Sequence, residues 1–139
     1  MHSLYLVSMY APPLTSPHCA HLWEAGLDPV ESSALVDLRV VLASLPCASA
    51  PVVAMGDLNA RTAAAVPDLA GHPPRHTVDP TLNTRGRALL RLATDVGVFI
   101  ATGSFAASHS TTSLGSCGTT LSTSIVDYTL ASPAAYSLI

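Results

Sequence analysis

The sequence predicts a single α/β domain, and three features support that prediction. The chain has 139 residues, which is about the length of one domain. Hydrophobic residues make up 49% of it and charged residues 11%, a composition that supports a buried core and excludes a disordered chain. Short apolar runs alternate with longer amphipathic stretches in the order strand, helix, strand, helix, strand, strand, which is typical of α/β (α+β) proteins.

The first half of the chain is expected to contain two strands with a helix between them. Ser3–Tyr10 is an apolar run that two prolines close, so it predicts a core strand. The segment that follows bears prolines and histidines and is expected to be a loop. Pro29–Leu45 has leucines at helical spacing and predicts an amphipathic helix. Val52–Met55 is too short for a helix and stops at a glycine, so it predicts a central strand.

The second half is expected to hold a long connection, one helix and two strands. Residues 61–84 are rich in alanine, proline and histidine without a clean period, so they predict an irregular connection. Gly86–Val96 has one apolar face and predicts a helix that the next glycine ends. Val98–Ala101 and Ile125–Ala131 are apolar and predict strands. Residues 102–124 are rich in serine and threonine and are expected to be extended and partly flexible.

Charge and cysteine content narrow the classes of function. The six basic residues are all arginines, and the nine acidic residues give a net charge of −3, which excludes a lysine-rich, nonspecific polyphosphate binder. No apolar run approaches the ~18 to 20 residues of a membrane span, so we expect no membrane partner. The three cysteines lack Cys-x-x-Cys spacing, which favours reduced thiols in an intracellular protein, nuclear or cytoplasmic.

Two polar residues follow the strand expected at Val52–Met55. Asp57 and Asn59 are two residues apart, so on an extended segment they point to the same side, at the carboxyl edge where open α/β sheets bind ligands. A carboxylate can orient a water molecule or hold a divalent cation, and an amide can donate to a phosphoryl oxygen. The alternative is a turn in which both side chains bond to the backbone.

Two more residues are candidates for the same edge. Asp127 lies within an otherwise apolar strand, where an unpaired buried carboxylate is costly, so we expect it to have a partner. The alternative is an aspartate on an edge strand that faces water. Tyr10 ends the first strand and presents its hydroxyl at this edge, or it is an aromatic residue at the core boundary. We expect convergence at one edge of the sheet for Tyr10, Asp57, Asn59 and Asp127.

Sequence blocks occur here in an order that resembles a known family. They are Tyr10-Ala11-Pro12-Pro13, Gly56-Asp57-Leu58-Asn59-Ala60, Arg85-Gly86-Arg87 before a leucine-rich helix and Val98-Phe99-Ile100-Ala101, and Ser124-Ile125-Val126-Asp127-Tyr128. Together they resemble the endonuclease/exonuclease/phosphatase (deoxyribonuclease I-like) superfamily, most closely the apurinic-type endonuclease domains of non-LTR retrotransposons. The resemblance covers the chain from Ser3 to about Ala131.

The resemblance implies a fold and an activity. In the family two sheets pack face to face between helices, so this chain is expected to form a partial four-layer α/β sandwich. Family members cleave a phosphodiester with a water molecule that Mg²⁺ assists, and we expect Mg²⁺, or Mn²⁺, as the cofactor. The metal offsets the charge that develops on the phosphoryl group. The implied partner is DNA, together with other domains of a longer polyprotein such as a reverse transcriptase.

The resemblance also implies a role for each candidate residue. Asp57 is expected to orient or deprotonate the water and to hold the metal. Asn59 is expected to contact the scissile phosphate, and Tyr10 is expected to hydrogen-bond a phosphate oxygen. Asp127 is expected to orient a histidine.

The sequence departs from the family pattern before Tyr10 and after Asp127. The metal-binding glutamate of the family lies upstream of the Tyr10 block, whereas Glu24 and Glu31 lie after it. The Ser-Asp-His motif that closes the family domain is not found after Asp127. We therefore expect residues 1–139 to be one truncated domain, the C-terminal half, with an uncovered sheet edge or face. We expect it to bind Mg²⁺ weakly and to be weak or inactive as an isolated endonuclease.

Two alternatives to the DNA endonuclease stay open at this point. The first is a noncatalytic remnant or binding module, which folds or binds a partner without chemistry. The second is a phosphatase or an RNA-directed member of the same superfamily.

Overall fold

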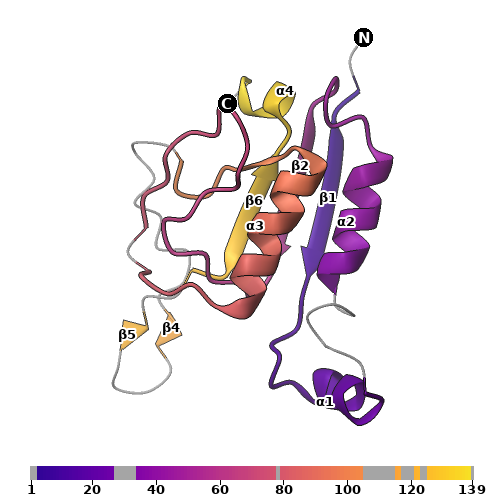
Figure 1. Ribbon diagram of the computed structural model, residues 1–139, viewed down its shortest axis with the longest axis vertical. Helices are drawn as coiled ribbons and strands as arrows, with labels where there is room; N and C mark the ends of the chain where they lie inside the picture. The colour runs from indigo at the N-terminus through magenta and orange to yellow at the C-terminus, as the bar shows by residue number, and fades with distance from the viewer. Residues whose placement is uncertain are drawn as a thin grey trace.

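A four-stranded mixed sheet forms the centre of the fold (Figure 1). The computed structural model describes residues 3–26, 34–77, 79–104, 115–116, 121–122 and 125–138. The sheet has the order β1-β2-β6-β3, with β1 at Tyr5–Tyr10, β2 at Val52–Asp57, β3 at Phe99–Ile100 and β6 at Asp127–Ala131. β1 is parallel to β2, and β6 is antiparallel to both of its neighbours. The predicted strands are confirmed, with β1, β3 and β6 shorter than expected and β2 extended through Gly56 to Asp57.

Two helices lie side by side on one face of the sheet (Figure 1). They are α2 (Ala34–Ser44) and α3 (Thr84–Val96), and both were predicted. Their apolar positions meet the inward side chains of the sheet in one core. That core includes Leu35, Leu38, Leu42, Leu89, Leu92, Val52, Ala54, Ile100 and Leu130. Burying each large aliphatic side chain stabilises the fold by about 1.5 to 3 kcal/mol.

The ends of α3 follow from its flanking residues. The Asn83 side chain accepts a hydrogen bond from the Gly86 N–H at 2.7 Å, which satisfies one of the free donors at the helix start. The helix therefore begins at Thr84 rather than at Gly86. Gly97 ends it in the left-handed conformation with φ 71°, which a glycine adopts without steric cost.

Two helices were not expected from the sequence. α1 (Pro17–Glu24) occupies part of the segment that was interpreted as a loop, and α4 (Pro133–Tyr136) follows β6. Each begins with a serine followed by a proline. Ser16 Oγ accepts from the Cys19 N–H at 3.4 Å, and Ser132 Oγ accepts from the Ala135 N–H at 3.2 Å. The loop prediction was wrong for α1 because serine before proline is also a helix-start signal.

The two segments expected to be irregular have different outcomes. Within residues 61–77 and 79–83 the structure has one isolated bridge, Thr62 to Leu82, and no helix or longer strand, so the irregular connection is confirmed. In the serine- and threonine-rich segment, β4 (Gly115–Ser116) pairs antiparallel with β5 (Leu121–Ser122). Most of residues 105–124 lie outside the described residues, and the expected flexibility with them. Among the described helices, none has the length and apolar character to cross a membrane.

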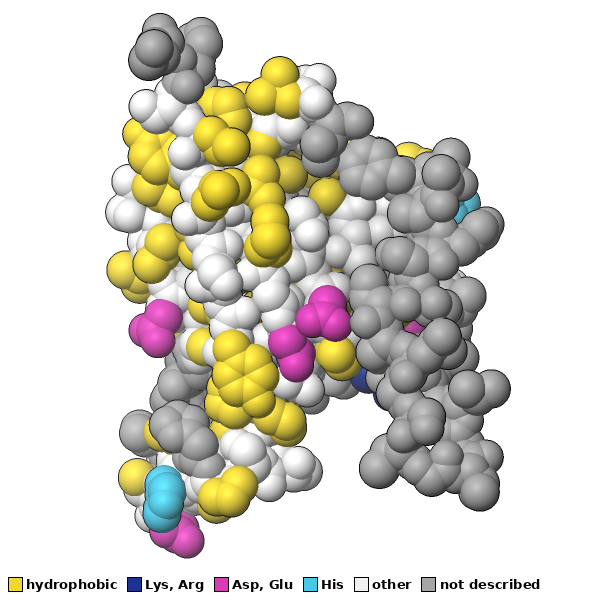
Figure 2. All heavy atoms as spheres, turned by 180° about the vertical axis from the view of Figure 1, so that it is seen from behind, with side chains coloured by type: hydrophobic (Ala, Val, Ile, Leu, Met, Phe, Trp, Pro, Cys, Tyr) yellow, Lys and Arg dark blue, Asp and Glu magenta, His cyan; other side chains and the backbone are white. Residues whose placement is uncertain are grey.

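The face of the sheet opposite α2 and α3 is open over β1 and β2. Side chains alternate along β1, so that Leu6, Ser8 and Tyr10 are exposed while the residues between them pack toward the helices. Leu6 is 68% exposed and Met55, on the same face of β2, is 48% exposed. Figure 2 shows apolar side chains over this face. β1 is also an edge strand, since among the described strands it pairs only with β2.

We predict that this open face and edge make the protein aggregate. Leu6→Thr is expected to slow aggregation, measured by light scattering, because it removes apolar surface beside an unpaired strand edge. The free energy of unfolding should change by less than about 0.5 kcal/mol, since the side chain is exposed. The control is Val40→Thr, at a residue 65% exposed on α2. Equal slowing by both variants would contradict a role of the sheet face.

Candidate functional site

Three strand ends that carry polar residues meet at one edge of the sheet. Tyr10 ends β1, Asp57 ends β2, and Asp127 begins β6, which runs in the opposite direction. In the register of the sheet Tyr10 is aligned with Asp57, and Asp57 is aligned with Asp127. The predicted convergence of these residues is therefore confirmed. Their catalytic roles remain a prediction.

The three side chains also share a face. Residues aligned across neighbouring strands project from the same side of a sheet, with Cβ atoms of a directly opposed antiparallel pair about 5 Å apart. For Tyr10, Asp57 and Asp127 this is the open face, opposite α2 and α3. Acidic side chains lie side by side on this face below the apolar area in Figure 2. The site is thus a pair of carboxylates bordered by a tyrosine.

Asn59 is held beside the pair by its backbone and its side chain. Its N–H donates to Asp57 Oδ1 at 2.9 Å, and its Nδ2 donates to the Ala11 carbonyl at 2.9 Å. Its backbone is left-handed with φ 44°, a conformation that asparagine adopts more readily than most residues. The extended segment expected here is therefore wrong, and the turn that was the alternative interpretation is confirmed, since both side chains bond to the backbone. This turn places Asn59 at the strand end. One Asp57 oxygen is thereby fixed.

A glycine brings β1 and β2 close together just before the site. Gly56 has φ 155°, and a Cβ at this position would overlap the Met9 carbonyl of the neighbouring strand. Any other residue would therefore push β1 away from β2. Because Tyr10 and Asp57 follow directly, Gly56 sets how closely these two site residues approach.

Asp127 has a different environment from the one expected. We expected it to have a partner, but within the described ranges no side chain donates a hydrogen bond to it, and no described histidine is oriented by it. The edge-strand alternative holds in part, because β6 lies between β2 and β3 but β3 pairs only with Leu130 and Ala131, so among the described strands Asp127 is paired with β2 alone. Burial, and then the charge of Asp57, raise the pKa of Asp127. The negative charges of Asp57 and Asp127 repel each other, and a cation bound between them would reduce that repulsion.

Tyr10 is exposed rather than placed at the core boundary. It is 62% exposed, at the end of the edge strand. The loop after it is held by Arg85, which is 1% exposed and donates from Nη1 to the Pro12 carbonyl at 2.6 Å. The Tyr10 ring therefore extends from a rigid strand end into solvent at the site edge.

The residues at this edge offer few ligands for a metal ion. No group of three or more histidine, cysteine, aspartate or glutamate side chains in the described part of the chain is arranged to hold a metal. Asp57, Asp127 and the Asn59 carbonyl oxygen are hard oxygen donors of the kind that Mg²⁺ prefers. They fit a hydrated ion that is held in part through its water molecules.

An ion pair beside the site, with one buried and one partly exposed partner, was not predicted from the sequence. Arg61 donates from Nε to Asp79 Oδ2 at 2.8 Å and from Nη2 to Asp79 Oδ1 at 2.6 Å. Asp79 Oδ2 also accepts from the Ile125 N–H at 3.1 Å, two residues before Asp127. Burial alone would raise the pKa of Asp79, but the hydrogen bonds from Arg61, Thr81 and Ile125 lower it to about 2. The pair ties the irregular connection to the start of β6.

A second arginine supports the same connection from within. Arg75 is 5% exposed, donates from Nη1 to Thr62 Oγ1 at 2.8 Å, and lies with its guanidinium 5.8 Å from the centre of the Tyr128 ring. The Tyr128 hydroxyl accepts from the Thr62 N–H at 3.1 Å. Burial lowers the pKa of Arg75. The only signal in the sequence was the presence of arginines in a segment without periodicity.

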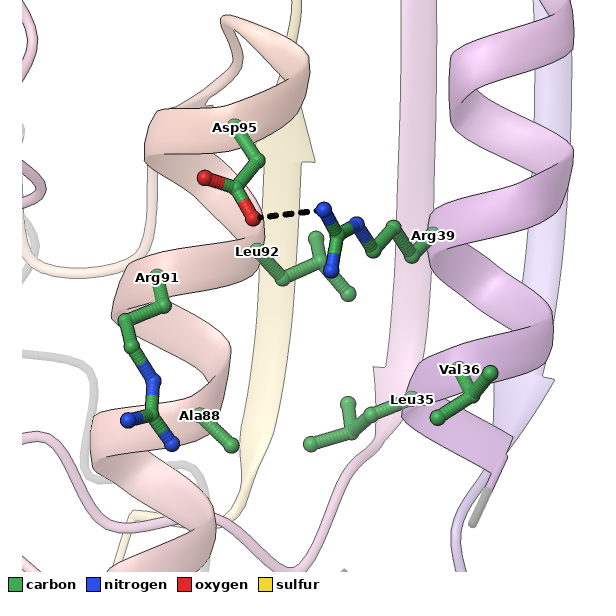
Figure 3. Close-up of a pocket in the computed structure, with 7 residues that line it drawn as sticks. All are labelled: Leu35, Val36, Arg39, Ala88, Arg91, Leu92 and Asp95. Carbon is green, nitrogen blue, oxygen red and sulfur yellow. Dashed lines mark ion pairs between the residues drawn. The ribbon is translucent and has the colours of Figure 1, made fainter. Parts of the chain in front are cut away.

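A groove between α2 and α3 lies on the other side of the sheet from the carboxylate pair. Its volume is about 370 Å³, and Arg39 Nη2 and Asp95 Oδ2 form an ion pair across it at 3.1 Å (Figure 3). The other lining residues in Figure 3 are Leu35, Val36, Ala88, Arg91 and Leu92. Both partners of the ion pair are well exposed, so it contributes at most about 1 kcal/mol. None of the predicted site residues lines this groove.

No family model, curated protein or solved structure matches the chain. The endonuclease resemblance, the metal and the DNA partner therefore stay predictions that rest on the sequence blocks and on the geometry of the strand ends.

We predict that Asp127→Asn stabilises the protein at pH 7. A raised pKa means that the native state binds the Asp127 proton more tightly than the unfolded chain, so stability is lost as pH rises from the ordinary aspartate value to the raised one. Removing one of two opposed charges is expected to increase the free energy of unfolding by about 0.5 to 1 kcal/mol. Urea unfolding at pH 7 and near pH 3 measures this gain and its loss in acid.

The matched control for this measurement is Asp95→Asn, which removes an aspartate that is paired with Arg39. It is expected to give no gain at pH 7. A lower free energy of unfolding for Asp127→Asn would show that Asp127 has a stabilising partner.

We predict that Asp79→Asn destabilises the protein at neutral pH. The lowered pKa means that the Asp79 carboxylate contributes stability that is present above about pH 4 and is lost as pH falls through about 2. The shift corresponds to about 2 kcal/mol of unfolding free energy at pH 7. Urea unfolding from pH 7 down to pH 2 should show the penalty disappearing in acid. The exposed Asp68, in the same connection, provides the control variant Asp68→Asn, and a penalty of equal size there would contradict the special role of Asp79.

Proposed function

We propose that this protein is a divalent-metal-dependent phosphodiesterase that acts on DNA as an endonuclease. The observation that carries the proposal is the register of β1, β2 and β6, which aligns Tyr10, Asp57 and Asp127 on one face. Two carboxylates at this sheet edge can serve as metal ligands and as a proton acceptor, and an amide and a phenol beside them can donate hydrogen bonds to a phosphate.

The carboxylate pair is the proposed place for the cation. One oxygen of Asp57 is engaged by the Asn59 N–H, which leaves the other free to hold a hydrated ion or to orient the attacking water. Asp127 has a raised pKa, so it binds a proton more readily than an exposed aspartate does. A cation between Asp57 and Asp127 would lower that pKa again. When bound, the ion would stabilise charge on the phosphoryl group.

The other two residues are proposed to contact the phosphate. Asn59 Nδ2 uses one hydrogen on the Ala11 carbonyl, and its second hydrogen is available for a phosphate oxygen. Tyr10 has an exposed ring at the same edge, so its hydroxyl can donate to a second oxygen. Both are fixed at their backbones by the strand end, which favours orientation of the substrate before the reaction.

The proposal includes a layer that covers the open sheet face. In a four-layer sandwich of the endonuclease/exonuclease/phosphatase type, the face with Leu6 and Met55 would pack against a second sheet. The exposure of these side chains, with α2 and α3 confined to the other face, supports that arrangement. The same exposed apolar face favours the second candidate, a noncatalytic binding module.

The test of this proposal is nicking of supercoiled DNA with and without Mg²⁺. The expected result is weak nicking that requires Mg²⁺ and is lost in Asp57→Asn, because groups that act as a unit fail together. Calorimetry should give Mg²⁺ affinity in the millimolar range at best, since two carboxylates are few ligands for an octahedral ion. Asp95→Asn on α3 is the control and should nick like the unchanged protein.

Two outcomes would contradict the proposal. Nicking that persists in Asp57→Asn would place the activity elsewhere. No nicking at any protein concentration, with the chain folded, would favour the noncatalytic binding module.

A further inference from the structure

The carboxylate pair raises the question of which residue attracts a phosphate. Asp57 and Asp127 repel a phosphodiester at long range, so a site for DNA needs a fixed cation near the same edge. All six basic residues of the chain are arginines. Arg75 and Arg85 are 5% and 1% exposed, and Arg39 and Arg91 line the groove between the helices. Arg87 is exposed on the first turn of α3, where it donates to the Leu82 carbonyl and to Thr84 Oγ1.

Arg61 differs from these because its side chain is partly open and tightly oriented. It lies two residues after Asn59, and its backbone bonds on both sides to Asn83, the N-terminal cap of α3, at 2.9 and 3.0 Å. Its Nε and Nη2 bond to Asp79, yet the side chain is 32% exposed. Within the described part of the chain, no hydrogen bond uses its remaining guanidinium nitrogen, Nη1.

The position of Arg61 follows from the hydrogen bonds of Asp79. Asp79 is 2% exposed and accepts both from Arg61 and from the Ile125 N–H, so one carboxylate separates the guanidinium from the start of β6. Leu58, between Asp57 and Asn59, donates its N–H to the Val126 carbonyl at 2.9 Å. The guanidinium therefore lies at the edge of the sheet that carries the carboxylate pair.

We propose that Arg61 binds a phosphate of the DNA backbone beside the carboxylate pair, with Asp79 as the positioning residue that orients its guanidinium. This inference rests on the proposed function, since it assigns a contact to the same substrate. A bidentate bond to a buried aspartate holds the guanidinium in one orientation, so little side-chain entropy is lost when its free edge meets a phosphate. A purely structural ion pair has no need of the free Nη1 or of an exposed side chain.

The salt dependence of DNA binding separates a phosphate contact from a structural ion pair. Each phosphate contact of a cationic side chain contributes about 0.9 to the slope of log affinity against log salt concentration for duplex DNA. The variant to use is the double substitution Arg61→Gln with Asp79→Asn. It keeps the net charge, retains hydrogen-bonding groups at both positions, and leaves no unpaired buried charge, so the chain keeps its long-range electrostatics.

The experiment measures fluorescence anisotropy of a labelled duplex of about 20 base pairs across a KCl series in EDTA. In the double variant the slope should fall by about 0.9 relative to the unchanged protein, and affinity near 0.1 M KCl should fall several-fold. The matched control is Arg39→Gln with Asp95→Asn, which removes an arginine–aspartate pair in the groove between α2 and α3, on the other side of the sheet. This control should leave slope and affinity unchanged. Circular dichroism checks that each variant is folded.

A second variant keeps the test decisive if the double variant fails to fold. Arg61→Lys retains the charge and should retain the slope, with weaker affinity because lysine lacks the bidentate fork. An affinity equal to that of the unchanged protein would then contradict the contact. An equal slope in the unchanged protein and the folded double variant would overturn the inference, as would an absence of duplex binding by the unchanged protein. The binding assay contains no metal, so its result is independent of the nicking assay with Mg²⁺. A lower slope in the double variant, together with no nicking in the Mg²⁺ assay, would support the phosphate contact and contradict the endonuclease. Mg²⁺-dependent nicking with an unchanged slope would do the reverse.

Discussion

The register between β2 and β6 determines where the core and the candidate site lie, and hydrogen bonds fix it at both ends. At one end the Val52 N–H donates to Ser132 Oγ at 3.0 Å, and the Ser132 N–H donates to the Val52 carbonyl at 2.9 Å. At the other end the Leu58 N–H donates to the Val126 carbonyl at 2.9 Å. A slip of one residue would turn every side chain of β6 to the other face of the sheet and move Asp127 to the helical side. Core packing and site geometry thus depend on one pairing.

Arginine side chains hold the irregular parts of the chain that the sheet does not reach. Arg75 donates to the carbonyls of Ala65 and Thr102 as well as to a side chain, and Arg85 donates to the carbonyl after the first strand. The planar guanidinium, with five donors, can satisfy several carbonyls that an irregular backbone leaves free. Lysine could not replace it, because an ammonium group reaches fewer acceptors at once. Arg75 and Arg85, which the sequence alone would place at the surface as charged residues, are therefore buried and stabilise irregular backbone.

The elements that depend on local patterns were predictable, and those that depend on distant partners were not. Leucine spacing and short apolar runs predicted α2, α3 and the strands of the sheet, and the strand ends predicted where Tyr10, Asp57 and Asp127 meet. The Ser-Pro starts of α1 and α4 were present in the sequence but their capping role was overlooked. The pairing of Arg61 with Asp79 crosses an irregular segment without periodicity, so no spacing rule predicts it. Strand order could not be predicted from the sequence either, since no local signal places β6 between β2 and β3.

The position of β6 in the sheet also has a consequence for the order of events during synthesis. β1, α2 and β2 leave the ribosome first and can assemble as a parallel crossover unit, because their partners are all in the first part of the chain. β3 has no strand to pair with at that stage, since its neighbour in the sheet is β6, which is made after it. The inner edge of β2 stays unpaired until then. Closure of the core thus waits until β6 has been made, and its rate is governed by how fast this strand finds its place between two partners from earlier parts of the chain.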